Sequence, residues 1–344
     1  MKRNACLTYV AAATSLALAA PVASAETMMV GHGFSPTHFI AKDLTEPWMA
    51  CVEEGTGKAL TFDYYPSGQI AAAAATLDAL NTGLLNVSTV SIGYVTNKLP
   101  LNGISMLPNM GETSKQMVAA YRTALDEIPE MSEELRANGF KTLVINLFPP
   151  YQILGRSDPI DTAAKFEGRL IRTAGSANTL TIRELGASPV EMPAADIYIA
   201  LERGTVDAAL LGLSSIKSYS LQELLKSISA NGQFGSFTTL LAMDLEDYEA
   251  LSEETRAVVD ACSLKIEADV AKLMDDEQKS LLDEFGAMGI TIYRYSDEEL
   301  ATLAERMKGV EEDFVTRLEA RGIAAAKVGE AYKKILAETP TFAE

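Results

Sequence analysis

One periodic stretch, from residue 252 to about residue 285, constrains the fold of this chain more than any other feature. Ser252 suits a helix N-cap. Apolar side chains then recur at helical spacing, at Val258, Cys262, Ile266, Val270, Leu273 and Leu281. Such a helix extends roughly 45 Å, which is long for a globular protein. A coiled coil is the alternative, but acidic and alanine positions interrupt the heptad. The stretch therefore predicts one helix that spans two lobes.

The rest of the chain alternates short apolar strands with helices. Strands are expected at residues 27–31, 60–65, 86–91, 141–146, 151–155, 188–191, 206–210 and 236–243. Helices are expected between them, including an alanine-rich helix from Gln69 to about residue 81. This alternation indicates an α/β fold with mainly parallel sheets and helices on both faces.

A break at residues 148–151, Phe-Pro-Pro-Tyr, marks the expected crossing into a second lobe. The apolar strand at 236–243 would bring the chain back. We predict that lobe I comprises residues 26–149 and about 237–277. Lobe II would then comprise residues 150–236 and about 278–344.

The first 25 residues have the pattern of a secretory signal peptide. Lys2 and Arg3 precede an apolar stretch at residues 7–20, and Ala23-Ser24-Ala25 offers a cleavage site. We expect cleavage near Ala25 and a periplasmic protein. A retained N-terminal anchor is the alternative.

The charge of the chain excludes some partners. Loss of Lys2 and Arg3 changes the net charge from −18 to −20, which argues against nucleic-acid binding, since that depends on Lys and Arg contacts to phosphate. The two histidines, His32 and His38, lie in one early loop. They are too few for a histidine-rich metal site, so we expect neither metal nor cofactor.

Two cysteines, Cys51 and Cys262, remain after the signal peptide. In an oxidising compartment they can form a disulfide. They can equally be two separate small core residues, and the sequence favours neither interpretation.

The run Phe166-Glu167-Gly168-Arg169-Leu170-Ile171-Arg172 is a short strand that ends near an arginine and leads into a helix. A guanidinium group fits a carboxylate through two parallel hydrogen bonds. Ligands of open α/β sheets bind beyond the carboxyl ends of the strands. Arg172 is therefore the leading candidate for an anion-binding residue, although a surface or interdomain ion pair is the alternative for any single arginine.

Several motifs together resemble one protein family. These are the run at 166–172, Gly186-Ala187-Ser188-Pro189 with Met192-Pro193, the segment 196–208, and Tyr65-Pro66-Ser67-Gly68-Gln69-Ile70. They resemble the solute-binding proteins of tripartite ATP-independent periplasmic (TRAP) transporters, the dicarboxylate-binding-protein-like (DctP) family. The resemblance covers nearly the whole chain after the signal peptide.

This resemblance implies a fold and a function. Two α/β lobes, joined by crossover strands and a long helix, would close on a small organic anion and deliver it to TRAP membrane permease subunits. Arg172 matches the family arginine that pairs with the ligand carboxylate. The resemblance also implies a binding protein and not an enzyme, which we expect to be monomeric.

Two departures from the family pattern bear on the ligand. Gln152 stands where the sialic-acid-binding members carry a second arginine, and Leu211 lies in a segment where they carry polar residues. One charge fewer and an added leucine favour a monocarboxylate, with aromatic, 2-oxo and hydroxy acids as candidates. A sulfonate is the alternative.

Other residues are candidates for the pocket wall, each with core packing, capping or a hinge position as its alternative. Most of these candidates are aromatic, since an aromatic side chain can stack on the planar ring of a ligand. They are Phe34 and His38 in the first strand–helix loop, Gln69, Tyr94, Phe148 and Tyr151 at the crossing, and Phe234 and Phe237 at the return crossing.

Two other functions remain open. A sensory ligand-binding subunit would have the same sequence features. A secreted α/β hydrolase or lyase needs a nucleophile beside a base, and the chain has no Gly-x-Ser-x-Gly motif.

Overall fold

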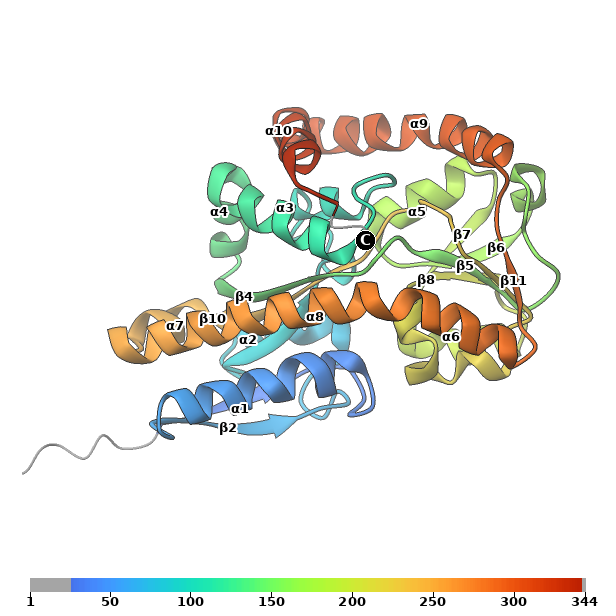
Figure 1. The fold of residues 1–344 in the computed structure, drawn as a ribbon. Coiled ribbons are helices and arrows are strands. Elements are labelled where there is room, and N and C mark those ends of the chain that lie inside the picture. The colour runs from blue at the N-terminus through green and yellow to red at the C-terminus, as the bar shows by residue number, and fades with distance from the viewer. Residues whose placement is uncertain (1–25, 342–344) are drawn as a thin grey trace, which may run out of the picture.

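The computed structural model describes residues 26–341 of the 344-residue chain. The predicted signal peptide therefore lies outside the described residues. Within the described part, no helix is both long and apolar enough to cross a membrane. Two β-sheets organise this part of the chain, and helices cover them (Figure 1).

The strands of the first sheet, in spatial order, are β2 (Leu60–Tyr65), β1 (Glu26–Gly31), β3 (Val87–Ser91), β10 (Thr238–Asp244) and β4 (Phe140–Leu147). Those of the second are β11 (Thr291–Tyr293), β9 (Ser227–Ser229), β5 (Gln152–Gly155), β8 (Ala208–Leu211), β6 (Leu170–Thr173) and β7 (Ser188–Glu191). The α-helices are α1 (Glu46–Gly55), α2 (Thr76–Asn81), α3 (Ser114–Glu127), α4 (Pro129–Ala137), α5 (Gly175–Glu184), α6 (Ile197–Glu202), α7 (Leu245–Ala250), α8 (Glu253–Ala287), α9 (Asp297–Glu319) and α10 (Ala325–Glu338). We call the first sheet and its helices lobe I, and the second sheet and its helices lobe II.

The α/β class, the two-lobed arrangement and the mainly parallel sheets are confirmed. Each sheet contains one strand that runs against the others, β10 in lobe I and β5 in lobe II. In lobe I, β1 runs parallel to β2 and β3, whereas β10 is antiparallel to β3 and β4. In lobe II, β6 is parallel to β7 and β8, whereas β5 is antiparallel to β8 and β9. The strands β5 and β10 each carry the chain into its lobe from the other one. They enter at the edge where the parallel strands end, so they run in the opposite direction.

The predicted long helix is confirmed as α8, which crosses the molecule in Figure 1. It packs against α1, α3 and β4 of lobe I and reaches β11 of lobe II. In lobe I its buried Glu267 forms an ion pair with Arg122 of α3 and accepts a hydrogen bond from the backbone N–H of Ile145 at 2.7 Å. These contacts hold α8 against the edge of the lobe I sheet.

Cys51 and Cys262 form a disulfide with a Cα–Cα distance of 5.8 Å. The bond joins α1 to α8, and the nearby Trp48 indole N–H donates to the hydroxyl of Ser263 at 3.0 Å. Of the two interpretations left open by the sequence, the structure shows the disulfide.

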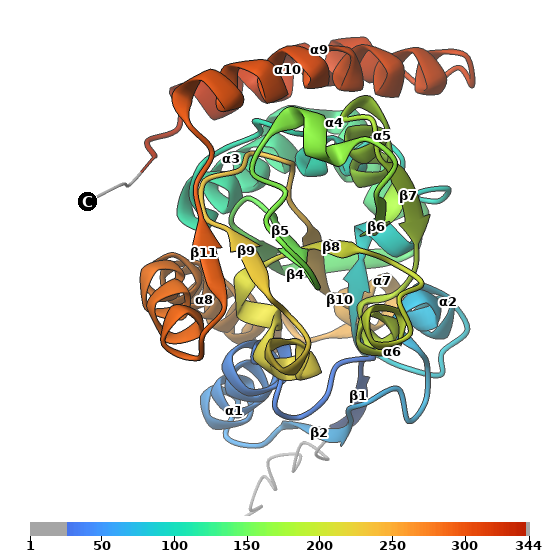
Figure 2. The same ribbon diagram turned by 90° about the vertical axis from the view of Figure 1, so that its right-hand side faces the viewer.

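The two C-terminal helices lie along one side of the molecule (Figures 1 and 2). Helix α9 packs on α5 of lobe II, but α10 packs on α3 of lobe I. The last helix thus lies against lobe I, which differs from its predicted place in residues 278–344 of lobe II. The other boundaries of the two lobes remain predictions.

The predicted helix at 69–81 is wrong in its first half, because α2 begins only at Thr76. The preceding turn is held by the first strand–helix loop instead. The N–H of Ser67 donates to the carbonyl of Phe34 at 2.8 Å, and that of Gly68, at φ +71°, donates to the carbonyl of His32 at 2.9 Å. Alanine's helix propensity is a weak preference that such tertiary contacts override.

Candidate functional site

Arg172 lies on β6, between the parallel strands β7 and β8. Its side chain reaches the end of both neighbours: Nε donates to the carbonyl of Met192, just after β7, at 2.9 Å, and Nη1 donates to the carbonyl of Leu210 on β8 at 3.2 Å. The guanidinium therefore stands at the carboxyl edge of three parallel strands. This edge is where open α/β sheets bind ligands.

The charge of Arg172 has no compensating carboxylate. The residue is 1% exposed, and it forms no ion pair with any residue that the structure describes. Its partners are two carbonyl oxygens and the hydroxyl of Tyr94, at 3.5 Å from Nη2. A guanidinium has five N–H groups, so N–H donors on its terminal nitrogens remain for another acceptor. Burying a charge is costly unless it is paired, and an anion at this place would pair it.

Tyr94 connects the two lobes at Arg172. It belongs to a 3₁₀ turn (Ile92–Tyr94) that follows β3 of lobe I. Its hydroxyl oxygen accepts hydrogen bonds from Arg172 and, at 3.0 Å, from the backbone N–H of Ala194, both in lobe II. Since the oxygen accepts twice, the hydroxyl proton of Tyr94 is left to donate elsewhere.

Two glycines permit the lobes to meet beside Tyr94. A Cβ on Gly175, at the start of α5, would lie 2.8 Å from the Cα and the carbonyl oxygen of Gly93. The φ of Gly175 is +81°, a conformation that favours glycine. Larger residues here would hold the two backbones apart.

Aromatic rings from both crossovers gather next to Tyr94. The ring of Phe237 lies 5.3 Å from that of Tyr94 and 6.1 Å from that of Tyr151. The rings of Phe237 and Tyr151 are nearly parallel, at 11°. Phe148 packs edge-on against both Phe237 and Tyr151. We call these four residues, Tyr94, Phe148, Tyr151 and Phe237, the aromatic cluster.

A second set of rings continues this cluster across the lobe seam. Phe39 of lobe I packs on Phe148 at 5.2 Å, and His38 packs on both Phe34 and Phe39. The ring of His38 also contacts that of Tyr219 in lobe II, at 5.5 Å. Rings from loops far apart in the sequence thus form one continuous series of contacts. We call these rings, the aromatic cluster with Phe34, His38, Phe39 and Tyr219, the wall.

Burial favours the neutral forms of three ionisable side chains in this wall, Tyr151, Tyr219 and His38. Burial raises the pKa of Tyr151 well above its usual value, although Arg172 partly opposes this shift, and burial likewise raises the pKa of Tyr219. Burial, with smaller contributions from His32 and Lys42, lowers the pKa of His38 to about 3. Its Nδ1 accepts a hydrogen bond from the N–H of Ile40 at 3.1 Å, which requires that nitrogen to be unprotonated.

The described residues offer nothing for metal chemistry. No group of three or more His, Cys, Asp or Glu side chains is arranged to hold a metal ion within residues 26–341. Arg172 and its aromatic surroundings can bind and orient an anion with a planar apolar part. They place no nucleophile beside a base.

The structure separates some predicted site residues from this group. The amide of Gln152 is used inside lobe II: Nε2 donates to the carbonyls of Pro150 and Gly232, and Oε1 accepts from Ser229 and Gly232. Phe234 packs against Phe166 and Tyr295 in lobe II. Neither side chain forms a hydrogen bond with Arg172, and their place on the pocket wall stays a prediction.

The remaining two predicted residues are less informative. Gln69 is exposed on the turn before α2 and does not begin a helix. Leu211 is buried at the end of β8, paired with Gln152 across the sheet and next to the carbonyl that binds Arg172. Its place at the strand end is compatible with a floor below the guanidinium.

Two ring residues of the wall, Phe39 and Tyr219, were not among the predicted residues. Phe39 directly follows the predicted His38, so its position in the same loop was a usable signal. Tyr219 lies in a 3₁₀ turn (Lys217–Tyr219) without apolar periodicity, and its contact with His38 joins segments that sequence patterns do not connect.

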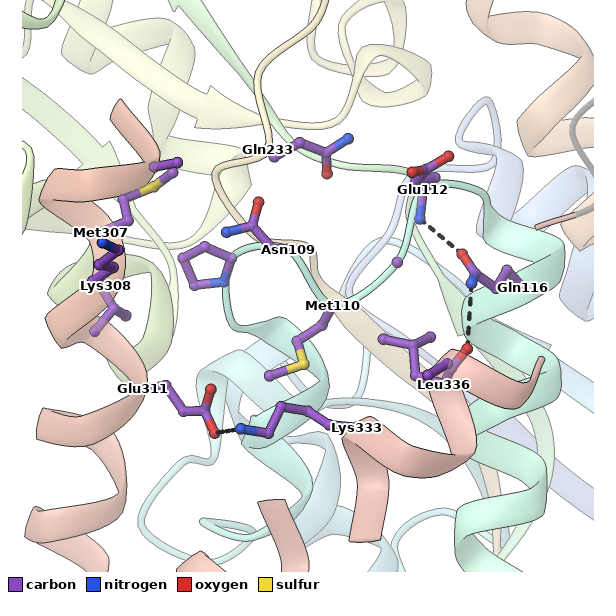
Figure 3. A pocket seen from close by; sticks show the side chains of 15 residues that line it. Asn109, Met110, Glu112, Gln116, Gln233, Met307, Lys308, Glu311, Lys333 and Leu336 are labelled. Atoms are coloured by element: carbon purple, nitrogen blue, oxygen red, sulfur yellow. Dashed lines mark hydrogen bonds and ion pairs between the residues drawn. The ribbon is translucent and has the colours of Figure 1, made fainter. Parts of the chain in front are cut away.

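A separate cavity of about 600 Å³ lies between α9, α10 and the loop before α3 (Figure 3). Arg172 does not line it. Polar groups in this cavity already bind one another: Lys333 pairs with Glu311 at 2.6 Å, and the Gln116 side chain binds the N–H of Glu112 and the carbonyl of Leu336. Size alone therefore does not identify the site.

Two α/β lobes that meet at a buried, unpaired arginine define a solute-binding protein of the periplasmic type. The model of the bacterial extracellular solute-binding protein family 7, DctP, matches residues 30–317. The chain belongs to this family, which confirms the resemblance inferred from its motifs. Proteins of this family bind solutes, so the chain is not an enzyme.

Similar proteins include three that can be compared in detail. The outer membrane transporter protein TsaT of Comamonas testosteroni is 26% identical over 310 residues, covering 88% of this chain and 89% of TsaT. A TRAP solute-binding protein of an unidentified marine microbe, described as specific for aromatic acid ligands and solved with 3-hydroxybenzoate, is 22% identical with a TM-score of 0.86, covering 92% of this chain and 99% of that one. A TRAP solute-binding protein of Rhodoferax ferrireducens, solved with copurified benzoate, is 23% identical with a TM-score of 0.84, covering 91% and 98%. The two structures share the fold of this chain.

Proposed function

We propose that this protein captures a small aromatic monocarboxylate between its lobes in the periplasm and delivers it to the membrane subunits of a TRAP transporter. It would act as a monomer after signal-peptide cleavage near Ala25. The observation that carries the proposal is the guanidinium of Arg172, which is buried at the lobe seam with no carboxylate partner among the described residues.

The contacts around Arg172 suggest how such a ligand is held. Its carboxylate would accept hydrogen bonds from the terminal nitrogens of Arg172, and charge-assisted pairs of this kind are the strong ones. The free hydroxyl proton of Tyr94 would be a further donor to the carboxylate. Because Tyr94 belongs to lobe I and Arg172 to lobe II, a ligand bound by both favours the closed form.

The choice of an aromatic ligand rests on the surrounding wall. Rings prefer offset-stacked or edge-on contacts at 4.5–7 Å, and the aromatic cluster with Phe34, His38 and Tyr219 supplies such faces from both lobes. The two structural neighbours that carry benzoate and 3-hydroxybenzoate share this fold. A 2-oxo or hydroxy acid without a ring would use Arg172 but would make no ring contact with the aromatic cluster.

A thermal-shift screen tests this function. We expect benzoate and 3-hydroxybenzoate to raise the melting temperature more than pyruvate, lactate or benzenesulfonate, because binding to the native state stabilises it by mass action. The Arg172→Met variant should show none of these shifts. Larger shifts with pyruvate or benzenesulfonate would refute the aromatic carboxylate, and shifts that persist in the variant would refute the site.

A further inference from the structure

A second cavity, of about 320 Å³, lies on the lobe seam away from the aromatic cluster. Its volume is in the range of small-molecule sites. Lobe I contributes Thr96 and Asn97, the helix α5 of lobe II contributes Ser176 and Arg183, and the end of α9 contributes Arg317. Helices α5 and α9 pack side by side (Figure 1).

Three arginines line this cavity: Arg183, Arg317 and Arg321. Only Arg317 has a carboxylate partner among the described residues, Asp313 of the same helix, through bonds of 2.9 and 2.8 Å. Arg183 and Arg321 form no ion pair with any described residue. One carboxylate, that of Glu191, also lines the cavity.

The concentration of positive charge is unusual for this chain. The whole sequence carries a net charge of −18, yet three arginines and one acidic residue, Glu191, line this single cavity. Asp313, which does not line it, pairs with Arg317. Like charges brought together repel one another, and an anion between them would relieve that repulsion. The pKa of Asp313 is lowered, mainly by its hydrogen bonds to Arg317 and with a smaller contribution from Arg183, so Arg183 and Arg317 lie near the same carboxylate.

From this arrangement we propose a second anion site at the lobe seam, formed by Arg183, Arg317 and Arg321 and suited to a small oxyanion such as phosphate or sulfate. Guanidinium groups match the oxygens of such ions through forked hydrogen bonds. The polar side chains of Thr96, Asn97 and Ser176 also line the cavity and can donate further hydrogen bonds.

This site is distinct from the ligand-binding site. Arg172 does not line the cavity, and none of the residues of the aromatic cluster does. The walls nevertheless come from both lobes, so an oxyanion that touches all of them favours the closed form. A coupling between the two sites follows, since an effector of the closed form raises the affinity of a ligand that also selects it. This coupling, unlike the site itself, rests on the proposed function.

The site is tested by calorimetric titration with inorganic phosphate at low ionic strength, in a buffer without other oxyanions. We expect saturable binding at one site, weakened at least about tenfold in the double variant Arg183→Gln/Arg321→Gln, since each arginine supplies charge-assisted hydrogen bonds. Both side chains are exposed, and circular dichroism should show that the variant folds. The control Arg294→Gln removes an exposed arginine that does not line the cavity and should leave phosphate binding unchanged.

Three results would overturn the site: absence of saturable phosphate binding, unchanged affinity in the double variant, or equal loss in Arg294→Gln. The Arg172→Met variant separates this site from the proposed function, because it should retain phosphate binding while losing 3-hydroxybenzoate. Loss of phosphate binding in Arg172→Met would place the ion in the ligand-binding site and refute the second site.

The coupling is tested by titrating 3-hydroxybenzoate with and without saturating phosphate. We expect phosphate to raise the affinity for 3-hydroxybenzoate several-fold in the wild type and to have no effect in the double variant. If the wild type bound 3-hydroxybenzoate equally tightly with and without phosphate, the coupling would be refuted. The titration with phosphate alone would then still decide whether the second site exists.

Discussion

Two arginines, the buried Arg172 at the lobe seam and the partly buried Arg122 on α3, have opposite surroundings. Arg122 forms an ion pair with Glu267 of α8 and also donates to the carbonyl of Leu143 at 3.1 Å. Arg172 is more deeply buried, at 1% exposed against 26% for the Arg122 side chain, but all its partners are uncharged oxygens.

The difference separates a structural charge from a functional one. Arg122 compensates a carboxylate whose pKa burial raises and Arg122 lowers, and the pair holds α8 to lobe I. Arg172 has no carboxylate partner among residues 26–341, and in the proposed function a bound anion would compensate its charge. A buried charge without a partner lowers the free energy of unfolding. A bound anion would pair with that charge and offset this cost.

The largest expected effect is the loss of ligand binding in Arg172→Met. Removing one member of a buried charge pair costs about 2–5 kcal/mol, so the affinity for 3-hydroxybenzoate should fall roughly 30- to 5,000-fold in calorimetry. The free energy of unfolding without ligand should stay equal or rise, since an unpaired buried charge is removed. A variant that loses stability and retains affinity would reverse the roles of the two arginines.

Arg122→Met should show the converse pattern, with a somewhat smaller effect. It leaves Glu267 buried without its ion partner, which costs about 3 kcal/mol, discounted somewhat because the Arg122 side chain is 26% exposed. Urea denaturation should show this loss, and calorimetry should show an unchanged affinity for 3-hydroxybenzoate. A matched loss of affinity would mean that the two regions are not independent.

The burial of His38 and His32 should make the free energy of unfolding depend on pH, because burial disfavours their protonated forms. Burial lowers the pKa of His38 to about 3 and that of His32 to about 4, both from 6.5. The unfolded chain therefore binds more protons than the native state between about pH 3 and 6.5. Stability is full above pH 6.5 and falls as the pH decreases through this window.

For His38 alone the loss between pH 7 and pH 5 is about 2 kcal/mol. Urea denaturation of wild type and His38→Gln at both pH values measures it. The wild type should lose about 2 kcal/mol more than the variant. Equal losses would show that His38 titrates normally and that the wall is open to water.

An effect of similar size is expected for Tyr94→Phe. This change removes one hydroxyl donor to the ligand carboxylate and the acceptor shared by Arg172 and Ala194. A hydrogen bond to a charged group contributes about 1.5–3 kcal/mol, so we expect affinity to fall at least about tenfold. The control Tyr248→Phe removes a hydroxyl that binds Asp260 in lobe I and should bind ligand as the wild type does. Equal affinities of Tyr94→Phe and the control would remove Tyr94 from the site.

Much of the fold follows from local patterns in the sequence. The periodicity from residue 252 onward predicted α8 nearly to its ends, and Arg172 was predicted at a strand end because short apolar strands and glycines delimit β6. The antiparallel direction of β5 and β10 was missed, since strand direction depends on which lobe the chain comes from and local patterns carry no such information.

The wall of the site was harder to predict for the same reason. Phe34 and His38 were predicted from the position of their loop, but Tyr219 contacts His38 only once both lobes have folded. Gln152 was assigned to the pocket by its place in the family pattern, whereas its amide binds Ser229 and Gly232. Such choices depend on three-dimensional partners far away in the chain.

The most direct test of the central claim compares one ligand with its uncharged counterpart. The wild type is titrated calorimetrically with 3-hydroxybenzoate and with 3-hydroxybenzamide. These two ligands differ only in the group that would face Arg172. A buried charge-assisted pair predicts that the carboxylate binds at least about 100-fold more tightly than the amide. Equal affinities, or tighter binding of the amide, would contradict the proposal that Arg172 binds the carboxylate of the ligand.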